Sequence, residues 1–471
     1  MKFGNDALRQ MAQRNRTTRR RFVREEDGTV TIFACFMILC MLMIGGIGVD
    51  LMRHEMERAR IQGIADRAVL AAADLDQTLD PETVVRDYFA KAWMSDFVSG
   101  VTVTEGLNFR TVKVDATTTM NTQFMNMVGV DTLTIPAAST AEEKVNKVEI
   151  SMVLDISGSM SRNGRMENLK DAAGVFIDTV LKSETQNLIS ISVVPYTAQV
   201  NAGRDIFDEL NIVRDHTYSY CVDFEEDDFD TAEISTTKAY LHMQHFDSGY
   251  SWNGSRNEGS ISNPGCPKRD FEEIIAFSQN PTFLKSQINQ YQPRANTSIH
   301  LGMKWGVGML DPDFNEITKE LGVDAVFNDR PSAYNDIETL KTIILMTDGE
   351  NVNTVRIDDS YYANYNHRRH WSIYPLGWYL NNYVYSSSHS NWRYTKYTSG
   401  QANTMLSNIC AAARAQNIVI WSIGFEVSNN GADVMRDCAS SPSHFFRVEG
   451  VEISKAFSAI ARQINQLRLI Q

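Results

Sequence analysis

The strongest constraint on this fold is a run of 22 residues, 28–49, without a charged side chain: GTVTIFACFMILCMLMIGGIGV. A helix needs about 20 mostly apolar residues to cross the hydrocarbon core of a bilayer. Core helices of soluble proteins are rarely apolar on every face. A cleaved signal peptide has a shorter apolar region followed by a small-residue cleavage site, which the sequence after this run does not offer. The run therefore predicts an uncleaved transmembrane anchor at 29–50.

The charges on either side of the run predict its orientation. Residues 1–28 carry eight Lys or Arg and four Asp or Glu, and the whole chain carries −13, so the rest of the chain carries −17. Loops rich in Lys and Arg stay in the cytoplasm. We therefore expect a cytoplasmic basic tail at 1–28 and an exported body after residue 50. The acidic body also argues against nucleic-acid binding, which requires a basic surface.

The cysteines agree with an exported body. Four of the six lie after the anchor, and an even number outside the cytoplasm favours disulfides. Three pairings are possible, and proximity in the sequence favours Cys221–Cys266 and Cys410–Cys438. No pair has C-x-x-C spacing, which argues against a zinc site.

Two segments are expected between the anchor and the main body. Residues 51–80 predict a helical stalk that continues the transmembrane helix, because small and apolar residues recur there at helical spacing. Its H-E-M-E-R sequence at 54–58 lacks the second His of the zinc-protease motif and is interpreted as a solvated helix face. Residues 81–147 predict a small α+β module. It should contain an amphipathic helix over 81–97, with Trp93 in its core stripe, followed by alternating strands.

Residues 148–471 alternate between apolar strands and amphipathic helices. This pattern predicts the α/β class, with a doubly wound, mostly parallel, Rossmann-like sheet covered on both faces. Two insertions, at about 205–290 and 351–400, interrupt it. The first contains the acidic run 223–230, interpreted as a solvated loop. The second is rich in Tyr and Trp, which either form a binding surface or pack the insertion onto the sheet.

Oxygen-bearing side chains follow the predicted strands. Asp155, Ser157 and Ser159 come at the end of the first buried strand of this region, and Asp348 ends another. Thr297 precedes a helix and can add a third hydroxyl. Two carboxylates and three hydroxyls are hard ligands that suit Mg²⁺ (or Mn²⁺), and an open coordination position would take a partner's carboxylate. The alternative is that the serines only cap a helix and Asp155 only closes a turn.

This constellation resembles the metal-ion-dependent adhesion site of von Willebrand factor type A domains, whose signature is D-x-S-x-S with a separate Thr and Asp. Asp155, Ser157 and Ser159 match its first part, Thr297 matches the Thr, and Asp348 matches the distal Asp. The resemblance covers about 148–471. It implies a von Willebrand factor A fold with a bound divalent cation.

The whole arrangement resembles the TadG-like proteins of tight-adherence (Flp) pilus assembly. The likeness is carried by DGTVTIFACFMILCM, GIGVDLMRHEMERARIQGIADRAVLAAA and VVPYTAQVNAG. It implies a single-pass protein of the bacterial inner membrane with a periplasmic body. Its function would be pilus assembly or surface attachment, and its partners would be pilus or surface proteins that present an acidic group.

Three functions remain open at this point. The leading hypothesis is a non-enzymatic adhesion or assembly protein that binds a partner through the metal. The second is a structural scaffold of the pilus machine whose metal only stabilises the fold. The third is a metal-assisted hydrolase. The sequence contains no G-x-S-x-G, H-E-x-x-H or G-x-x-x-x-G-K-[ST] motif, so an enzyme is not expected.

Overall fold

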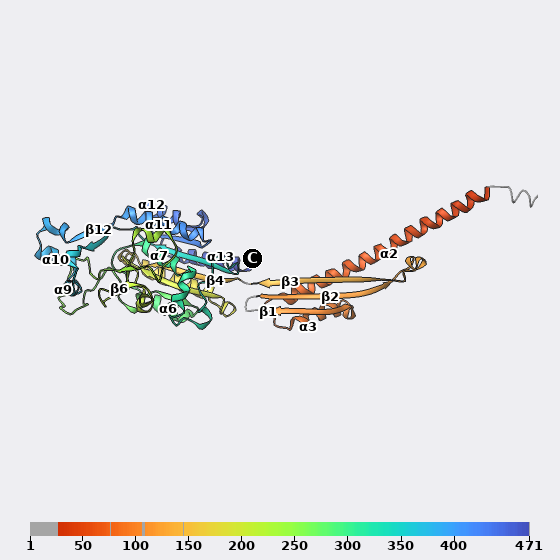
Figure 1. Cartoon of the computed structure of the whole chain (residues 1–471), viewed down its shortest axis with the longest axis horizontal. Coiled ribbons are helices and arrows are strands. Elements are labelled where there is room, and N and C mark those ends of the chain that lie inside the picture. The colour runs from red at the N-terminus through yellow and green to blue at the C-terminus, as the bar shows by residue number, and fades with distance from the viewer. Residues whose placement is uncertain (1–26, 76, 106–108, 145, 471) are drawn as a thin grey trace, which may run out of the picture. The chain divides into compact units, whose positions relative to one another are not determined.

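The structure, a computed structural model, describes residues 27–75, 77–105, 109–144 and 146–470 (Figure 1). The chain divides into two compact units, Met1–Lys144 (unit 1) and Val145–Gln471 (unit 2). Most of the basic tail expected at 1–28 lies outside the described residues. The anchor, the stalk and the small module expected from the sequence all contribute residues to unit 1.

Unit 1 is built on one long helix, α2 (Asp27–Ala73), which continues without a break from the apolar run into the stalk. Side chains between 29 and 45 are uncharged, mostly apolar and almost all exposed. Within the described part of the chain, α2 is the one helix long and apolar enough to cross a membrane. The second half of α2 is different, because one face of it is buried against the rest of unit 1.

That face packs on a three-stranded antiparallel sheet, ordered β1-β2-β3. Its strands are β1 (Val98–Glu105), β2 (Phe109–Asn121) and β3 (Thr132–Lys144). Ala65, Ala68 and Ala72 of α2 are fully buried there, in one core with Val112 and Val114 of β2. Small side chains on the helix let its backbone lie close to the sheet, so the predicted α+β module is completed by the stalk.

The helix predicted over 81–97 ends earlier than expected. The structure has α3 (Pro81–Lys91) followed by a short 3₁₀ turn, η1 (Ser95–Phe97). Trp93 adopts a φ of 64°, a left-handed conformation that ends the helix. Its side chain is 94% exposed, so the prediction that Trp93 belongs to the core stripe was wrong.

Unit 2 contains a six-stranded sheet in the order β14-β13-β10-β4-β5-β9. Neighbouring strands are parallel except for β9, which is antiparallel to β5. The strands are β4 (Lys147–Asp155), β5 (Ile189–Tyr196), β9 (Ile275–Ser278), β10 (Thr339–Thr347), β13 (Val419–Phe425) and β14 (Phe445–Val448). The predicted α/β class with a doubly wound, mostly parallel sheet is confirmed.

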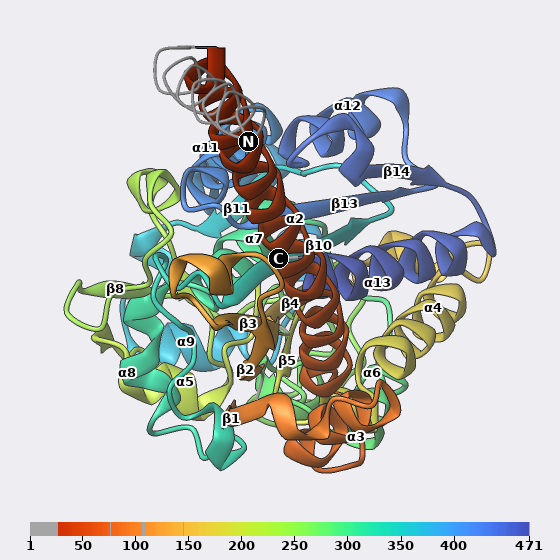
Figure 2. The same ribbon diagram turned by 90° about the vertical axis from the view of Figure 1, so that its right-hand side faces the viewer.

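Helices cover both faces of this sheet (Figure 2). On one face α4 (Arg165–Val180) packs on α13 (Glu452–Ile470), with the rings of Phe176 and Phe457 edge to face. On the other face α7 (Ile299–Gly308) packs on α11 (Ser399–Ala415). The remaining helices of unit 2 are α5 (Gly203–Glu209), α6 (Pro281–Ile288), α8 (Asn315–Thr318), α9 (Tyr365–Trp371), α10 (Leu376–Tyr383) and α12 (Asn429–Cys438).

The two insertions pack against each other. They contain small strands: β6 (Ile212–Val213), β7 (Val222–Asp223), β8 (Tyr240–His242), β11 (Thr354–Ile357) and β12 (Arg393–Tyr397). Cys221, Cys266, Trp371 and Leu376 share one buried cluster, so residues from both insertions build a common core. The first insertion is smaller than the expected 205–290, because β9 near its end belongs to the main sheet.

The acidic run 223–230 is not a solvated loop, which corrects the interpretation from the sequence. Asp223 is buried and accepts hydrogen bonds from Arg356 of the other insertion, with Oδ2 3.0 Å from Nε. Phe224 and Phe229 are fully buried in the hydrophobic core. Asp228 is paired with Lys238 at 2.7 Å. Two phenylalanines flank four consecutive acidic residues and anchor the run, while Glu225, Glu226, Asp227 and Asp230 stay exposed.

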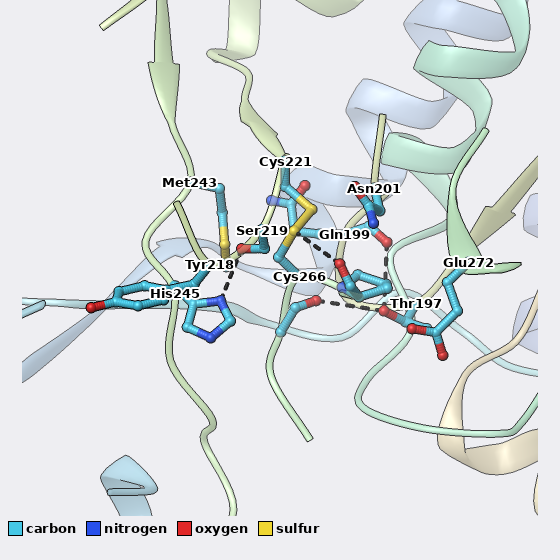
Figure 3. The surroundings of a disulfide bond; sticks show 12 residues. Thr197, Gln199, Asn201, Tyr218, Ser219, Cys221, Met243, His245, Cys266 and Glu272 are labelled. Carbon is cyan, nitrogen blue, oxygen red and sulfur yellow. Dashed lines mark hydrogen bonds between the residues drawn. A yellow bond between two sulfur atoms is a disulfide. The ribbon is translucent and has the colours of Figure 1, made fainter. Parts of the chain in front are cut away.

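Both predicted disulfides are present, at Cys221–Cys266 and Cys410–Cys438. Beside the first of them, the Ser219 hydroxyl and the ring of His245 are 2.8 Å apart (Figure 3). Cys35 and Cys40 in α2 are free. The second disulfide ties α11 to α12 across the strand β13.

We expect the Cys410→Ala/Cys438→Ala double variant to lose about 3 kcal/mol of stability, because a 28-residue separation is no longer closed in the unfolded chain. Unit 2 should then melt roughly 4 °C lower. Calorimetry of the two proteins under non-reducing conditions measures this. Peptide mapping that finds both thiols free in the wild type would contradict it.

Glu273 makes stability depend on pH. Burial raises the pKa of Glu273 from its ordinary 4.5 to about 7, and the nearby Asp270 and Asp205 add to the rise. Between these values the folded state keeps a proton that the unfolded state has released. Stability is therefore lost as pH rises through this window.

We expect Glu273→Gln to be as stable as wild type at pH 4 and more stable at pH 8, by about 2 kcal/mol after allowing for solvent screening. Melting temperatures at both pH values measure the difference, which should be about 3 °C at pH 8. An equal shift at the two pH values would show that packing, and not charge, is responsible.

Candidate metal centre

The predicted site residues meet at one edge of the main sheet. Asp155 is the last residue of β4, and Asp348 follows β10 directly. These strands are neighbours, while the next strand along the chain, β5, lies on the other side of β4. The strand order therefore reverses between β4 and β10, and ligands of doubly wound sheets bind at such switch points, beyond the carboxyl ends of the strands.

Asp155 is held on both of its oxygens. Oδ1 accepts a hydrogen bond from the backbone N–H of Ser157 at 2.7 Å, which turns the chain sharply after the strand. Oδ2 accepts one from the Thr347 hydroxyl at 2.6 Å, across the β4–β10 pair. The residue is completely buried. Its position is thus set by its own loop and by the neighbouring strand.

The three hydroxyls form a chain that leads to the second carboxylate. The Thr297 hydroxyl donates to Ser157 Oγ at 2.9 Å, and Ser157 Oγ lies 2.9 Å from Ser159 Oγ. The Ser159 hydroxyl donates to Asp348 Oδ1 at 2.6 Å. The structure therefore brings all five predicted residues together, including Thr297, which is 140 residues from Ser157 in the chain.

Two charged residues that were not predicted from the sequence, Arg165 and Glu426, also lie at the site. Arg165, the first residue of α4, donates to Asp348 Oδ2 at 2.7 Å and through Nε to Glu426 at 2.8 Å. Glu426 directly follows β13, so the rule that strand ends carry site residues would have found it. For Arg165 we find no comparable signal in the sequence. Arg165 occupies one oxygen of Asp348, and the other faces the hydroxyls.

The two carboxylates oppose each other electrostatically. Burial raises the pKa of Asp155, and the neighbouring Asp348 carboxylate raises it further. A buried pair of like charges is costly unless a cation compensates it. Arg165 provides one positive charge, but it contacts the oxygen of Asp348 that faces away from the hydroxyls. Among the described residues, the hydrogen bonds of the Asp155 carboxylate come from Ser157 and Thr347, and none comes from a basic side chain.

Helix α7 brings Thr297 into the site because it lies very close to the sheet. Gly302 and Gly306 face β4 and β5. A Cβ atom at Gly306 would lie 2.3 Å from Val153 Cγ2, and one at Gly302 would lie 2.6 Å from the Tyr196 ring. Contacts under 3 Å force a shift, so only glycine permits this approach. The helix spacing, and with it the position of Thr297, depends on these two residues.

The donor set suits a hard dication. It offers two carboxylates and three hydroxyls. Three of its residues are joined in a chain of side-chain hydrogen bonds to Asp348, and Asp155 is held by the Ser157 N–H. All five donors are oxygens and only two are charged, which suits Mg²⁺ and Mn²⁺. In the described ranges no group of three or more His, Cys, Asp or Glu side chains could hold a metal, and this site contains only two such side chains, Asp155 and Asp348. Asp155, Ser157, Ser159, Thr297 and Asp348 thus fit the cation that the sequence predicted, although its binding remains a prediction.

The aromatic insertion begins next to this site. The backbone N–H of Val352 donates to the Thr297 carbonyl at 3.2 Å, and Asn351 accepts from the N–H of Ile299 at 2.7 Å. Asn351 also contacts the His300 ring, whose pKa is lowered to about 4 by burial. His300 is therefore neutral and directed at Asn351.

The aromatic side chains of the insertion divide between the two roles left open by the sequence. Trp371, Tyr362 and Tyr397 are buried and pack the insertion onto the rest of unit 2. Tyr365 and Tyr385 are exposed, at 61% and 88%. Packing therefore explains the buried rings of the insertion, while its exposed tyrosines can contact another molecule.

One known family matches the N-terminal part of the chain. Residues 28–75 match a family described as "Putative Flp pilus-assembly TadE/G-like". This segment of the chain is TadE/G-like. The match covers α2 from Gly28 onward, and it agrees with the resemblance of this N-terminal segment that was predicted from the sequence. No curated protein matches the chain.

Several solved structures are similar to parts of the chain. The von Willebrand factor domain of the type V pili tip protein Mfa5 from Porphyromonas gingivalis has 14% identity and a TM-score of 0.36, covering 69% of this chain and 97% of that one. The pilus adhesin SpaC from Lactobacillus rhamnosus GG has 10% identity and a TM-score of 0.34, with 78% and 34% covered.

A third similar structure is the proximal thread matrix protein 1 of the mussel byssus, solved with a zinc-occupied MIDAS motif. It has 12% identity and a TM-score of 0.29, with 69% of this chain and 46% of that chain covered. These likenesses are distant. The fold of unit 2 accordingly rests on its own strand order and on the D-x-S-x-S loop after β4.

Proposed function

We propose that this protein is a membrane-anchored, non-enzymatic adhesion or assembly protein of a tight-adherence (Flp) pilus system. In this proposal Asp155, Ser157, Ser159, Thr297 and Asp348 hold Mg²⁺ (or Mn²⁺), and the cation binds an acidic group on a pilus or surface protein. The observation that carries the proposal is the convergence of these five oxygen-bearing side chains at the switch point of the sheet, in a chain whose N-terminal segment is TadE/G-like.

The charges of the site support a role in recruiting an acidic group. Hydroxyl ligands are neutral, so a cation held by two carboxylates and three hydroxyls keeps an electrophilic open face. The chain as a whole carries −13, so long-range forces repel an acidic partner. Affinity must then come from the short-range bond to the cation and from neighbouring contacts. Exposed Tyr365 and Tyr385 are candidates for those contacts.

A second candidate function is a scaffold whose site only stabilises the fold. It is favoured by Arg165, which joins the end of β10 to the residue after β13 through Asp348 and Glu426. The two functions differ in what they predict for a site variant. A scaffold variant should unfold more easily, whereas an adhesion variant should stay folded and lose its partner.

Surface attachment by cells tests the proposed function. A strain lacking this chain is complemented with wild type, Asp155→Asn or Ser151→Ala. Ser151 is a matched control, because its buried hydroxyl lies on the same strand outside the site. We expect Asp155→Asn to lose attachment at normal protein level and normal melting temperature. Normal attachment by this variant would contradict the adhesion role, and a lowered melting temperature would favour the scaffold.

The proposed location is the bacterial inner membrane, with the N-terminus cytoplasmic and unit 2 in the periplasm. Alkaline phosphatase is active only outside the cytoplasm, so we expect a fusion after the last residue to be active. The same fusion to a chain that lacks 28–49 is the control and should be inactive. An inactive fusion to the full chain, together with an active cytoplasmic reporter at the same position, would contradict the topology.

A further inference from the structure

The loop between β2 and β3 is unusually apolar for an exposed turn. Residues 121–130, here called the tip loop, read NTQFMNMVGV and contain no charged side chain. The loop includes the 3₁₀ helix η2 (Met125–Val128). Met127 is 68% exposed, Val128 49% and Phe124 39%. Phe124 lies partly against α2, whereas the exposed parts of Met127 and Val128 face away from the protein, so their surroundings are argued from the position of the loop.

The tip loop is fixed onto α2 at the end of the apolar run. The Asp50 carboxylate accepts backbone hydrogen bonds from Gln123 at 3.0 Å, Phe124 at 2.7 Å and Met125 at 2.8 Å, and Asp50 is completely buried. One turn earlier on α2, a Cβ atom at Gly46 would lie 2.5 Å from the Phe124 ring. The loop therefore lies against residues 46–50, where the uncharged segment of α2 ends (Figure 1).

The backbone of the tip loop is largely satisfied within unit 1. Besides the three N–H groups bound by Asp50, the N–H groups of Met127, Gly129 and Val130 donate to carbonyls of the loop itself. The Thr122 hydroxyl donates to the Val130 carbonyl at 2.6 Å. Non-helical backbone can approach hydrocarbon only when its polar groups are satisfied in this way. The charge of Asp50 is likewise covered by donors.

The surface of α2 around the loop continues the apolar patch. Val49, Leu51 and Met52 are 46%, 49% and 68% exposed, and Arg53 follows as the first basic residue of α2. The exposed apolar side chains of the tip loop are therefore held beside the spanning segment, at the level where it passes from uncharged to charged residues. At that level the neighbour of an exposed apolar surface is the boundary between acyl chains and headgroups.

We propose that the tip loop enters the membrane interface beside α2 and forms a second contact between unit 1 and the bilayer. This inference rests on the proposed membrane anchor. A single spanning helix is free to rotate about its axis and to change its depth. A second contact on one side of the helix removes this freedom, so it sets how unit 1 is presented above the membrane.

Site-specific fluorescence of the full chain tests this proposal. The free thiols are removed by Cys35→Ala and Cys40→Ala, and the other four cysteines are protected as disulfides. Single cysteines are then introduced by Met127→Cys in the tip loop, Ile38→Cys in the apolar run and Leu79→Cys in the loop before α3. These positions are all exposed within the protein, at 68%, 57% and 61%.

Each variant is labelled with an environment-sensitive nitrobenzoxadiazole fluorophore and reconstituted into vesicles of phosphatidylcholine and phosphatidylglycerol. Quenching by doxyl-labelled lipid is compared with quenching by aqueous iodide. We expect lipid quenchers near the headgroup to reduce the emission at position 127 about twofold, because the tip loop would lie at the acyl boundary. Position 38 should be quenched by deep labels, and position 79 by iodide alone.

The three positions separate the possible outcomes. Lipid quenching at 38 without quenching at 127 overturns the inference and leaves the anchor intact. No lipid quenching at either position shows that the anchor itself fails. Protection of 127 from both quenchers means that a protein surface, such as a second copy, covers the loop, which also overturns it. Asp50→Asn should reduce lipid quenching at 127 and leave 38 unchanged, whereas Asp66→Asn, farther along α2, should alter neither.

Discussion

Asp155→Ala is expected to abolish the binding of Mg²⁺ and Mn²⁺ by the full chain. The change deletes one of only two carboxylates at the site, and with it the acceptor that holds the Ser157 loop and Thr347 in place. Loss of outer-shell partners of a metal costs about 10–100-fold in affinity, so removal of this charged group should cost about 100-fold or more. Titration calorimetry of the chain in nanodiscs measures it.

Two neighbouring variants make this prediction specific. Ser157→Ala should weaken binding less, roughly tenfold, because water can replace a neutral hydroxyl. Ser151→Ala, on the same strand but outside the site, should leave the titration unchanged. An unaltered isotherm in Asp155→Ala, or no binding by the folded wild type, would show that the five residues do not hold a cation.

Asp155→Ala also leaves two buried donors, the Ser157 N–H and the Thr347 hydroxyl, without an acceptor. Asp155→Asn therefore serves as the check on folding. The amide keeps the size of the side chain and one acceptor oxygen, and it removes the repulsion from Asp348 that raises the pKa of Asp155. In the presence of a chelator we expect Asp155→Asn to melt at or above the wild-type temperature. A loss of metal binding with retained stability separates the ligand role from a structural one.

Gly306→Ala is expected to destabilise unit 2 by roughly 4 kcal/mol, at the upper end of the cost of overpacking a core. Its Cβ atom would lie 2.3 Å from Val153 Cγ2 on a buried strand. Neither side can move without shifting α7 away from the sheet. Such a shift also carries Thr297 away from Ser157, so we expect cation affinity to fall about tenfold as well. Chemical denaturation and the same titration measure the two effects.

The structure offers a rescue and a matched control for this change. Val153→Ala removes the clashing methyl groups, and the nearest Val153 atom to the new Cβ would then be 3.7 Å away. The double variant should therefore recover part of the lost stability and part of the lost cation affinity. Both should be higher than the sum of the two single-variant effects predicts. Gly174→Ala on α4, whose nearest neighbour is 3.8 Å away on the flexible Lys285, should be neutral or stabilise by up to about 1 kcal/mol. Strictly additive losses would contradict the close-approach explanation.

Much of the candidate site was predictable because parallel strands share an edge. Once the apolar strands before Asp155 and Asp348 are recognised, their carboxyl ends must lie together, and the loops after them must carry the ligands. Glu426 obeys the same rule and was overlooked. Arg165 obeys no such rule, since the first residue of a helix can face any direction until the helix is packed.

Where the sequence misled, a distant contact was decisive. The run 223–230 contains enough acidic residues to be taken for a solvated loop, but Arg356, 133 residues later, pairs with Asp223 in the core. Trp93 has helical spacing from Phe89, but Trp93 itself adopts a left-handed backbone conformation that ends the helix and leaves the ring in solvent. Local pattern records which residues are apolar or charged, but not which partner meets them.

The sequence by itself predicted the long apolar helix, the α/β class and the meeting of Asp155 and Asp348 at one edge of the sheet, and proximity favoured the two disulfides that the structure contains. These follow from local composition, from periodicity and from the geometry common to all parallel sheets, whereas Thr297 was assigned to the site through the family resemblance. Only the tertiary structure decided the pairing of the two insertions, the place of Arg165 beside Asp348 and the docking of the tip loop on Gly46 and Asp50. These contacts join segments tens to hundreds of residues apart, and their energy exists only after the chain has closed the loops between them.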